Sequence, residues 1–186
     1  TYNTEHERWQ GTVFTDRWGQ LAIATLLPGQ HNMANIAGML GCLSQLAAAG
    51  HLKGAWGKED LIRSILSFAG VQKRSEYIGT FHGSPVFVDF AHHPTAVGIV
   101  LETFATRYPG RRLLVAFAPK NASSRRNIFA SLYAQAFKRA GVALIGACRE
   151  DVRIPEDQRM NIDQLAQSIG PESRAFGLAP LLSRPL

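Results

Sequence analysis

The sequence predicts an α/β protein whose C-terminal part is a doubly wound, mostly parallel sheet, preceded by a hairpin and two helices. From Glu76 onward, short apolar runs alternate with segments of helical period, which is typical of parallel strands joined by crossover helices. Before that point, two strand-like runs precede two helical segments. Residues 69–74 interrupt the pattern, so we predict a domain boundary there, with domains at residues 1–71 and 72–186.

The N-terminal part is expected to begin with two strands, at residues 11–16 and 21–27, joined by a turn around Gly19. A helix is predicted from about residue 33 to 49 and ends at Gly50. Small and apolar residues cover a wide face of this helix, so we expect it to be mostly buried. A second helix is predicted at residues 58–68.

The C-terminal part is expected to contain five strands and three helices. The predicted strands are residues 76–81, 86–90, 112–117, 142–147 and 174–176, and the predicted helices are 96–107, 125–140 and 162–169. Residues 178–186 have neither pattern, so we expect the sheet to lack its last strand and helix.

Composition predicts a cytoplasmic globular protein. Apolar residues make up 46% of the chain, but no run is long enough to span a membrane, and the polar start does not resemble a signal peptide. Cys42 and Cys148 lie far apart in apolar surroundings, which predicts buried free thiols in a reducing compartment. We therefore expect neither a membrane association nor a disulfide framework.

The net charge of +6 is concentrated in residues 103–149, which contain nine Lys and Arg residues and no Asp or Glu. A field of one sign attracts phosphates, carboxylates or nucleic acid. The window has no interleaved aromatic residues for base stacking, which argues against nucleic acid. A solvated basic face without function, or a structural or regulatory α/β domain, is the alternative interpretation.

Asp89 ends an apolar strand and is followed by His92, His93 and Pro94. A strand, a short polar turn and a helix start together make an anion-binding corner, although an Asp in this place can also be a simple cap. The two histidines have no companions at metal-ligand spacing, so we predict no metal site. Asn32 and Asn35 fall on one face of the first long helix, where Asn32 could alternatively be the N-cap.

Four motifs carry a family resemblance: G-Q-H-N-M-A-N, G-V-Q-K-R-S-E, D-F-A-H-H-P-T-A and F-A-P-K-N-A-S-S-R-R-N-I-F. In this order they resemble the Mur ligase family, the ATP-dependent amino-acid and peptide ligases of peptidoglycan synthesis. The last two look most like those members that join the tripeptide L-Ala-γ-D-Glu-meso-diaminopimelate to UDP-N-acetylmuramate during cell-wall recycling. Members that add L-alanine are the weaker match.

The resemblance implies three domains, of which this chain would hold the end of the central ATPase domain and most of a Rossmann-like C-terminal domain. It also implies ATP and Mg²⁺, with the P-loop, the magnesium ligands and the UDP site outside the chain. We therefore expect no catalytic residue here and no turnover by this part alone. The partners implied are small molecules, namely UDP-N-acetylmuramate, the peptide and ATP.

Carried over by motif, the resemblance places Asn32 and Asn35 beside the adenine, Arg74 at the nucleotide and Asp89 at the ribose. These side chains suit those groups, because amides pair with base edges, carboxylates accept from hydroxyls and guanidinium binds phosphate. The residues implied to face the amine-bearing substrate are His92, His93, Lys120, Ser124, Arg125 and Arg126.

Overall fold

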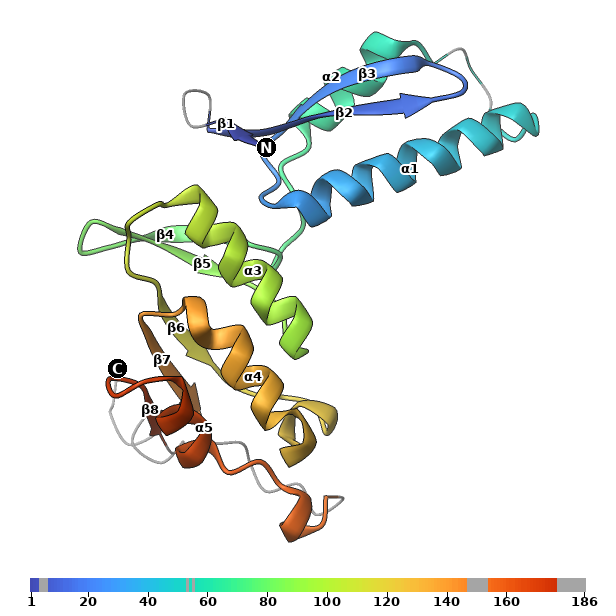
Figure 1. The fold of residues 1–186 in the computed structure, drawn as a ribbon. Helices are drawn as coiled ribbons and strands as arrows, with labels where there is room; N and C mark the ends of the chain where they lie inside the picture. The colour runs from blue at the N-terminus through green and yellow to red at the C-terminus, as the bar shows by residue number, and fades with distance from the viewer. Residues whose placement is uncertain (4–6, 53, 55, 147–153, 177–186) are drawn as a thin grey trace, which may run out of the picture. The chain divides into compact units, whose positions relative to one another are not determined.

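A computed structural model describes residues 1–3, 7–52, 54, 56–146 and 154–176 (Figure 1). The chain divides into two compact units, Thr1–Asp89 and Phe90–Leu186, which we call unit 1 and unit 2. This division follows the hairpin of residues 76–88, whereas the predicted domain boundary precedes it. The domain division at residues 71 and 72 stays a prediction.

Unit 1 begins with an antiparallel sheet, β1 (Tyr2–Asn3), β2 (Arg8–Thr15) and β3 (Gly19–Thr25), which confirms the predicted hairpin. Gly19 closes the turn with a φ of 64°, a conformation that glycine adopts without strain. Helices α1 (Gln30–Ala48) and α2 (Lys58–Ser67) pack on this sheet. The shared core consists of Leu21, Ile23, Ile36, Leu40, Leu61 and Ile65.

The expectation that α1 is mostly buried was wrong. Among its apolar side chains only Ile36 and Leu40 are buried, whereas Met39 and Leu46 are each 43% exposed. The reason is that α1 contacts the hairpin along one face, and among the described residues of unit 1 no second layer covers its other face. Cys42 lies on that open face and is exposed, which corrects the prediction of a buried thiol; Cys148 lies outside the described residues.

A second, separate hairpin ends unit 1. Strands β4 (Glu76–Phe81) and β5 (Ser84–Val88) are antiparallel, and the Glu76↔Val88 pair is the last at the open end. His82 and Gly83 form the turn as expected, both with positive φ. This register places residues 75 and 89 opposite each other just beyond the strands.

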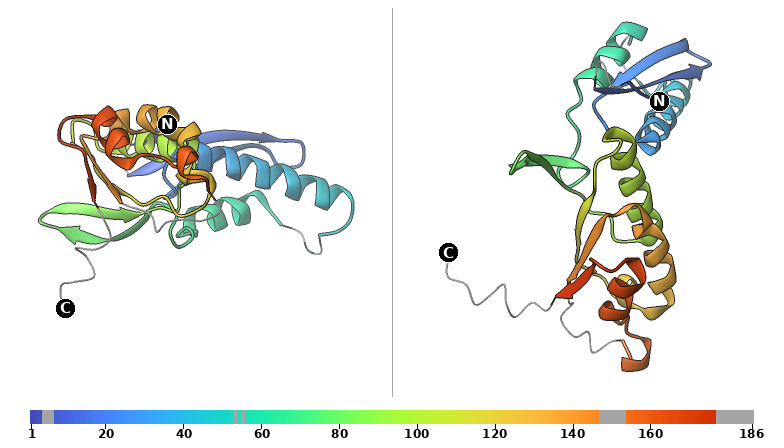
Figure 2. Two further views of the ribbon diagram at one scale, coloured as in Figure 1. Left: turned by 90° about the horizontal axis from the view of Figure 1, so that it is seen from below. Right: turned by 60° about the vertical axis from the view of Figure 1, so that its left-hand side comes forward.

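Unit 2 is an α/β unit with a parallel sheet, as the sequence predicts. Helix α3 (Pro94–Arg107) precedes β6 (Leu114–Phe117), α4 (Ala130–Ala136), β7 (Val142–Gly146), α5 (Ile162–Ile169) and β8 (Arg174–Phe176). The sheet order β6-β7-β8 follows the sequence. Right-handed crossovers between strands that advance in one direction place their helices on the same face. Figure 2 shows the helices on one side of this sheet.

Burial alternates along the strands accordingly. Phe117, Ala143 and Ile145 face the helices and are buried, whereas Leu114 and Leu144 on the opposite face are 74% and 42% exposed. The core beneath the helices also contains Val97, Leu101, Tyr133, Phe137, Met160, Leu165 and Ala166. None of the helices in the described ranges is long and apolar enough to cross a membrane.

The helix predicted at residues 125–140 is shorter than expected. Two 3-10 turns, Ser123–Arg125 and Asn127–Phe129, come before α4, and a third, Phe137–Arg139, follows it. The reason is long-range: Arg126 is extended and bridges Arg159, while the Arg125 carbonyl accepts from the Met160 N–H at 2.7 Å. These contacts remove the first turn from the helix.

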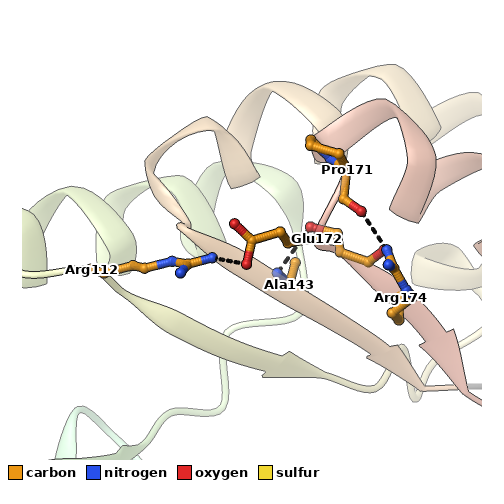
Figure 3. A network of polar contacts seen from close by, with 6 residues as sticks. Arg112, Ala143, Pro171, Glu172 and Arg174 are labelled. Carbon is orange, nitrogen blue, oxygen red and sulfur yellow. Dashed lines mark hydrogen bonds and ion pairs between the residues drawn. The ribbon is translucent and has the colours of Figure 1, made fainter.

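Polar contacts attach β8 to the rest of the sheet (Figure 3). The buried Ser173 hydroxyl accepts from the Ala143 N–H at 3.1 Å, and Glu172 forms an exposed ion pair with Arg112. Within its own segment, the Arg174 guanidinium also donates to the carbonyls of Pro171 and Ser173, which orders the approach to β8. The short strand β8 is therefore held by side chains as well as by its ladder.

Candidate functional site

The first group of predicted site residues lies at the start of α1. Gly29 turns the chain with a φ of 95°, and the helix begins at Gln30, so Asn32 is inside the first turn and is not the N-cap. Its Nδ2 donates to the Pro28 carbonyl at 2.7 Å, and its Oδ1 accepts from Asn35 Nδ2 at 3.4 Å. The two amides thus lie on one face, as their spacing predicts, and each orients the other.

The second group lies at the open end of the β4–β5 hairpin. Asp89 Oδ2 accepts from the Ser75 backbone N–H at 2.7 Å and from its hydroxyl at 3.1 Å. Arg74 is the neighbour of Ser75, so the antiparallel register brings Arg74 and Asp89 to the same end of the hairpin. The fifteen-residue spacing between them is therefore the spacing of a hairpin. All four predicted nucleotide residues belong to unit 1.

His31 is a further candidate site residue, which the sequence alone did not single out. Burial lowers the pKa of His31, and the negative charge of Asp89 acts in the opposite direction. Its Nδ1 is buried without a hydrogen-bond partner in the part of the chain that the structure describes. Asp89 therefore exerts its field on the start of α1, which links the two groups within unit 1. The only signal in the sequence is that His31 adjoins Asn32.

The histidines of unit 2 stand in the turn before α3. The His93 Nδ1 accepts from the Thr95 N–H at 3.4 Å as a helix cap, and its ring meets Phe129 edge-on at 5.4 Å. His92 Nδ1 lies 3.0 Å from the Phe90 carbonyl, which can only accept, so Nδ1 carries the proton in this arrangement. The His92 carbonyl accepts from the hydroxyl of Tyr133, a fully buried residue of α4.

The basic loop after β6 is organised by its own side chains. Arg125 Nη2 donates to the Lys120 carbonyl at 2.7 Å, and its Nε donates to the Pro119 carbonyl at 3.3 Å. Ser124 is 2% exposed; its N–H donates to the side-chain oxygen of Asn121, and its hydroxyl donates to the Asn121 carbonyl. The Lys120 side chain is exposed.

A later segment of unit 2 supports this loop from outside it. The Arg126 Nη1 lies 3.3 Å from Gln158 Oε1, and Asn127 Nδ2 donates to the Asp157 carbonyl at 2.8 Å. Phe129, two residues beyond these contacts, reaches the His93 ring. The structure thus brings the histidine turn and the end of the basic loop together. Arg149, the last basic residue of the window 103–149, lies outside the described residues.

The arrangement offers groups that suit an organic anion. In residues 1–3, 7–52, 54, 56–146 and 154–176, no three His, Cys, Asp or Glu side chains gather closely enough to hold a metal ion. The exposed cation of Lys120 and the half-buried guanidinium groups of Arg125 and Arg126 instead suit carboxylate or phosphate oxygens.

Comparisons with known proteins agree with these motifs. Residues 73–176 match the family described as Mur ligase, glutamate ligase domain. A UDP-N-acetylmuramate–L-alanine ligase of Oleidesulfovibrio alaskensis is 34% identical over 102 residues, 55% of this chain and 21% of its own. Another, of Bifidobacterium adolescentis, is 32% identical over 135 residues, 73% of this chain and 24% of its own. The chain thus spans about a quarter or less of these relatives.

Solved structures share the fold at low sequence identity. The UDP-N-acetylmuramate–alanine ligase of Thermotoga maritima matches 96% of this chain and 37% of its own, with a TM-score of 0.69 and 17% identity. A murein peptide ligase of Psychrobacter arcticus matches 90% of this chain and 33% of its own, with a TM-score of 0.55 and 22% identity. Because the family model covers more than half of its residues, this chain belongs to the Mur ligase family.

Proposed function

We propose that the chain is part of an ATP-dependent ligase that joins UDP-N-acetylmuramate to the tripeptide L-Ala-γ-D-Glu-meso-diaminopimelate. The muramoyl carboxylate takes the γ-phosphoryl group of ATP and ADP leaves. The L-alanyl amine then attacks the acyl phosphate, loses a proton and displaces inorganic phosphate, which leaves an amide. In this proposal residues 1–71 are the end of an ATPase domain and residues 72–186 an amine-substrate domain. Because the reaction consumes ATP, we propose a cytoplasmic location.

The nucleotide would contact unit 1. Asn32 and Asn35 offer paired amide donors and acceptors for the adenine edge, and Asp89 offers a carboxylate for the ribose hydroxyls. Arg74 would neutralise phosphate charge. These residues fit a nucleotide, since they combine an amide face, a carboxylate and a guanidinium in one unit. Magnesium would neutralise phosphate charge and would draw its protein ligands mainly from outside this chain.

The amine-bearing substrate would contact unit 2 through His92, His93, Lys120, Arg125 and Arg126, while Ser124 shapes the loop from inside. The observation that carries the choice of the tripeptide is the charge of this unit. Residues 103–149 hold nine basic residues and no acidic one, which suits a peptide with several carboxylates better than L-alanine with one. L-Alanine remains the second candidate, because the two relatives named above are L-alanine ligases.

The test is ADP formation by the complete ligase with ATP, Mg²⁺ and UDP-N-acetylmuramate, supplied with either the tripeptide or L-alanine. We expect kcat/KM to be at least about tenfold higher for the tripeptide, a difference of about 1.4 kcal/mol. A preference for L-alanine would support the second candidate. If neither amine stimulates ADP formation, both ligase proposals are wrong.

A further inference from the structure

The loop that carries Arg74 has an unusual backbone. Its two neighbours, Lys73 and Ser75, have φ values of 58° and 48°. Glycine adopts this left-handed conformation freely, but L-residues other than Asn and Asp seldom do, because their Cβ approaches a neighbouring carbonyl oxygen. Such strain persists only where surrounding contacts hold it, and it concentrates at functional sites.

Two carboxylates supply those contacts. Asp89 Oδ2 accepts from the Ser75 N–H at 2.7 Å and from the Ser75 hydroxyl at 3.1 Å. Glu76 Oε2 accepts from the Lys73 N–H at 2.7 Å. Each left-handed residue therefore donates its N–H to a charged acceptor, and both bonds lie at short, charge-assisted distances. Arg74 stands between the two anchored residues.

We propose that Ser75 is a positioning residue: through its hydrogen bonds to Asp89 it fixes the backbone that presents the Arg74 guanidinium to the nucleotide. A carboxylate has two oxygens and several acceptor sites, so Asp89 can hold Ser75 and also serve a ribose. The inference rests on the proposed function for its ligand. The part that concerns the loop backbone depends only on the hydrogen bonds of Lys73 and Ser75.

The test compares Ser75→Asn with Ser75→Asp, two side chains of nearly equal shape that both tolerate the left-handed conformation. Both variants keep the backbone N–H that bonds Asp89. The Asn side chain is neutral and carries an amide donor, whereas Asp places a second carboxylate beside Asp89 and repels it. In the complete ligase we expect Ser75→Asp to raise the KM for ATP about tenfold, the loss of one charge-assisted contact. Ser75→Asn should stay within about twofold, and the KM for UDP-N-acetylmuramate should not change.

The same pair of substitutions at His82 is the matched control. His82 has a φ of 47°, is exposed, and lies at the opposite end of the hairpin. Neither His82→Asn nor His82→Asp should alter the KM for ATP. Amide hydrogen exchange on the 186-residue chain provides a readout that needs no ligand: residues 74–76 should exchange faster in Ser75→Asp but not in Ser75→Asn.

Two double variants decide whether Ser75 acts through its partners. With Asp89→Asn, which removes the repelling charge, the exchange difference between Ser75→Asp and Ser75→Asn should vanish. With Arg74→Ala, their KM difference should vanish as well. Equal KM values for the two Ser75 variants, or a KM difference that persists in full without Arg74, would overturn the inference. Failure of the unmodified ligase to use ATP would instead refute the proposed function, while the exchange data would still decide the loop.

Discussion

Removing the hydroxyl of Tyr133 tests how the histidine turn is held. Tyr133 is fully buried between Phe117 and Phe137, with ring centroids 5.2 and 6.3 Å away, and its hydroxyl donates to the His92 carbonyl. Tyr133→Phe keeps the ring and its packing but leaves that carbonyl without this donor. This hydrogen bond is only partly buried, so water can reach the carbonyl, and we expect a loss of stability of about 0.5–1.5 kcal/mol.

Urea unfolding of the chain measures this loss by circular dichroism. All three tryptophans, Trp9, Trp18 and Trp56, belong to unit 1, so their fluorescence reports the other unit in the same sample. Tyr77→Phe is the matched control, because its hydroxyl contacts Thr80 on an exposed hairpin. We expect the control to change stability by less than about 0.5 kcal/mol. If Tyr133→Phe is no more destabilising than the control, the hydroxyl does not hold the turn.

Three further results are expected. Asp89→Asn should lower the already depressed pKa of His31, measured by NMR titration, and an unchanged pKa would contradict the link. Because the folded chain has the lower pKa, the unfolded chain binds more protons below about 6.5, so the stability contributed by neutral His31 is lost as the pH falls from about 6.5 towards the folded pKa. Ser173→Ala should lower the free energy of unfolding in urea by about 1–3 kcal/mol, because the N–H of the fully buried Ala143 loses its acceptor. An unchanged free energy would mean that another acceptor replaces this hydrogen bond. Arg125→Lys should speed amide exchange in residues 120–127, because one ammonium cannot reproduce the two guanidinium contacts. Unchanged exchange would show that these contacts do not order the loop.

Elements that depend on local pattern were predicted well. The first long helix ends at Gly50 as predicted, and acidic residues occupy the first turn of α2. Both features depend on capping interactions between near neighbours, which a sequence reveals directly. The α3 helix begins at Pro94, two residues before the apolar period suggests, since proline suits the first helical position. The Asn32 and Asn35 pair lies on one face for the same local reason.

Features that depend on distant partners were not predicted. The start of the helix expected at residue 125 is lost to contacts with the segment around Gln158, which no local period reveals. The open face of α1 also carries large apolar side chains, such as Met39 and Leu46, so apolar residues alone do not reveal which face is covered. In the sequence Ser124 is typical of an exposed polar loop residue, but in the structure it is buried and forms hydrogen bonds to Asn121.

The stretch from Val86 to Thr95 shows both contributions. The sequence by itself determined that an apolar strand ends in a carboxylate and that a proline-started helix follows, because side-chain period and proline geometry are local properties. Only the tertiary structure decided what these groups hold. The antiparallel register brings Asp89 within hydrogen-bond distance of Ser75, and the packing of α4 brings the Tyr133 hydroxyl to the His92 carbonyl. Both depend on which distant segments meet, and that is a property of the folded chain.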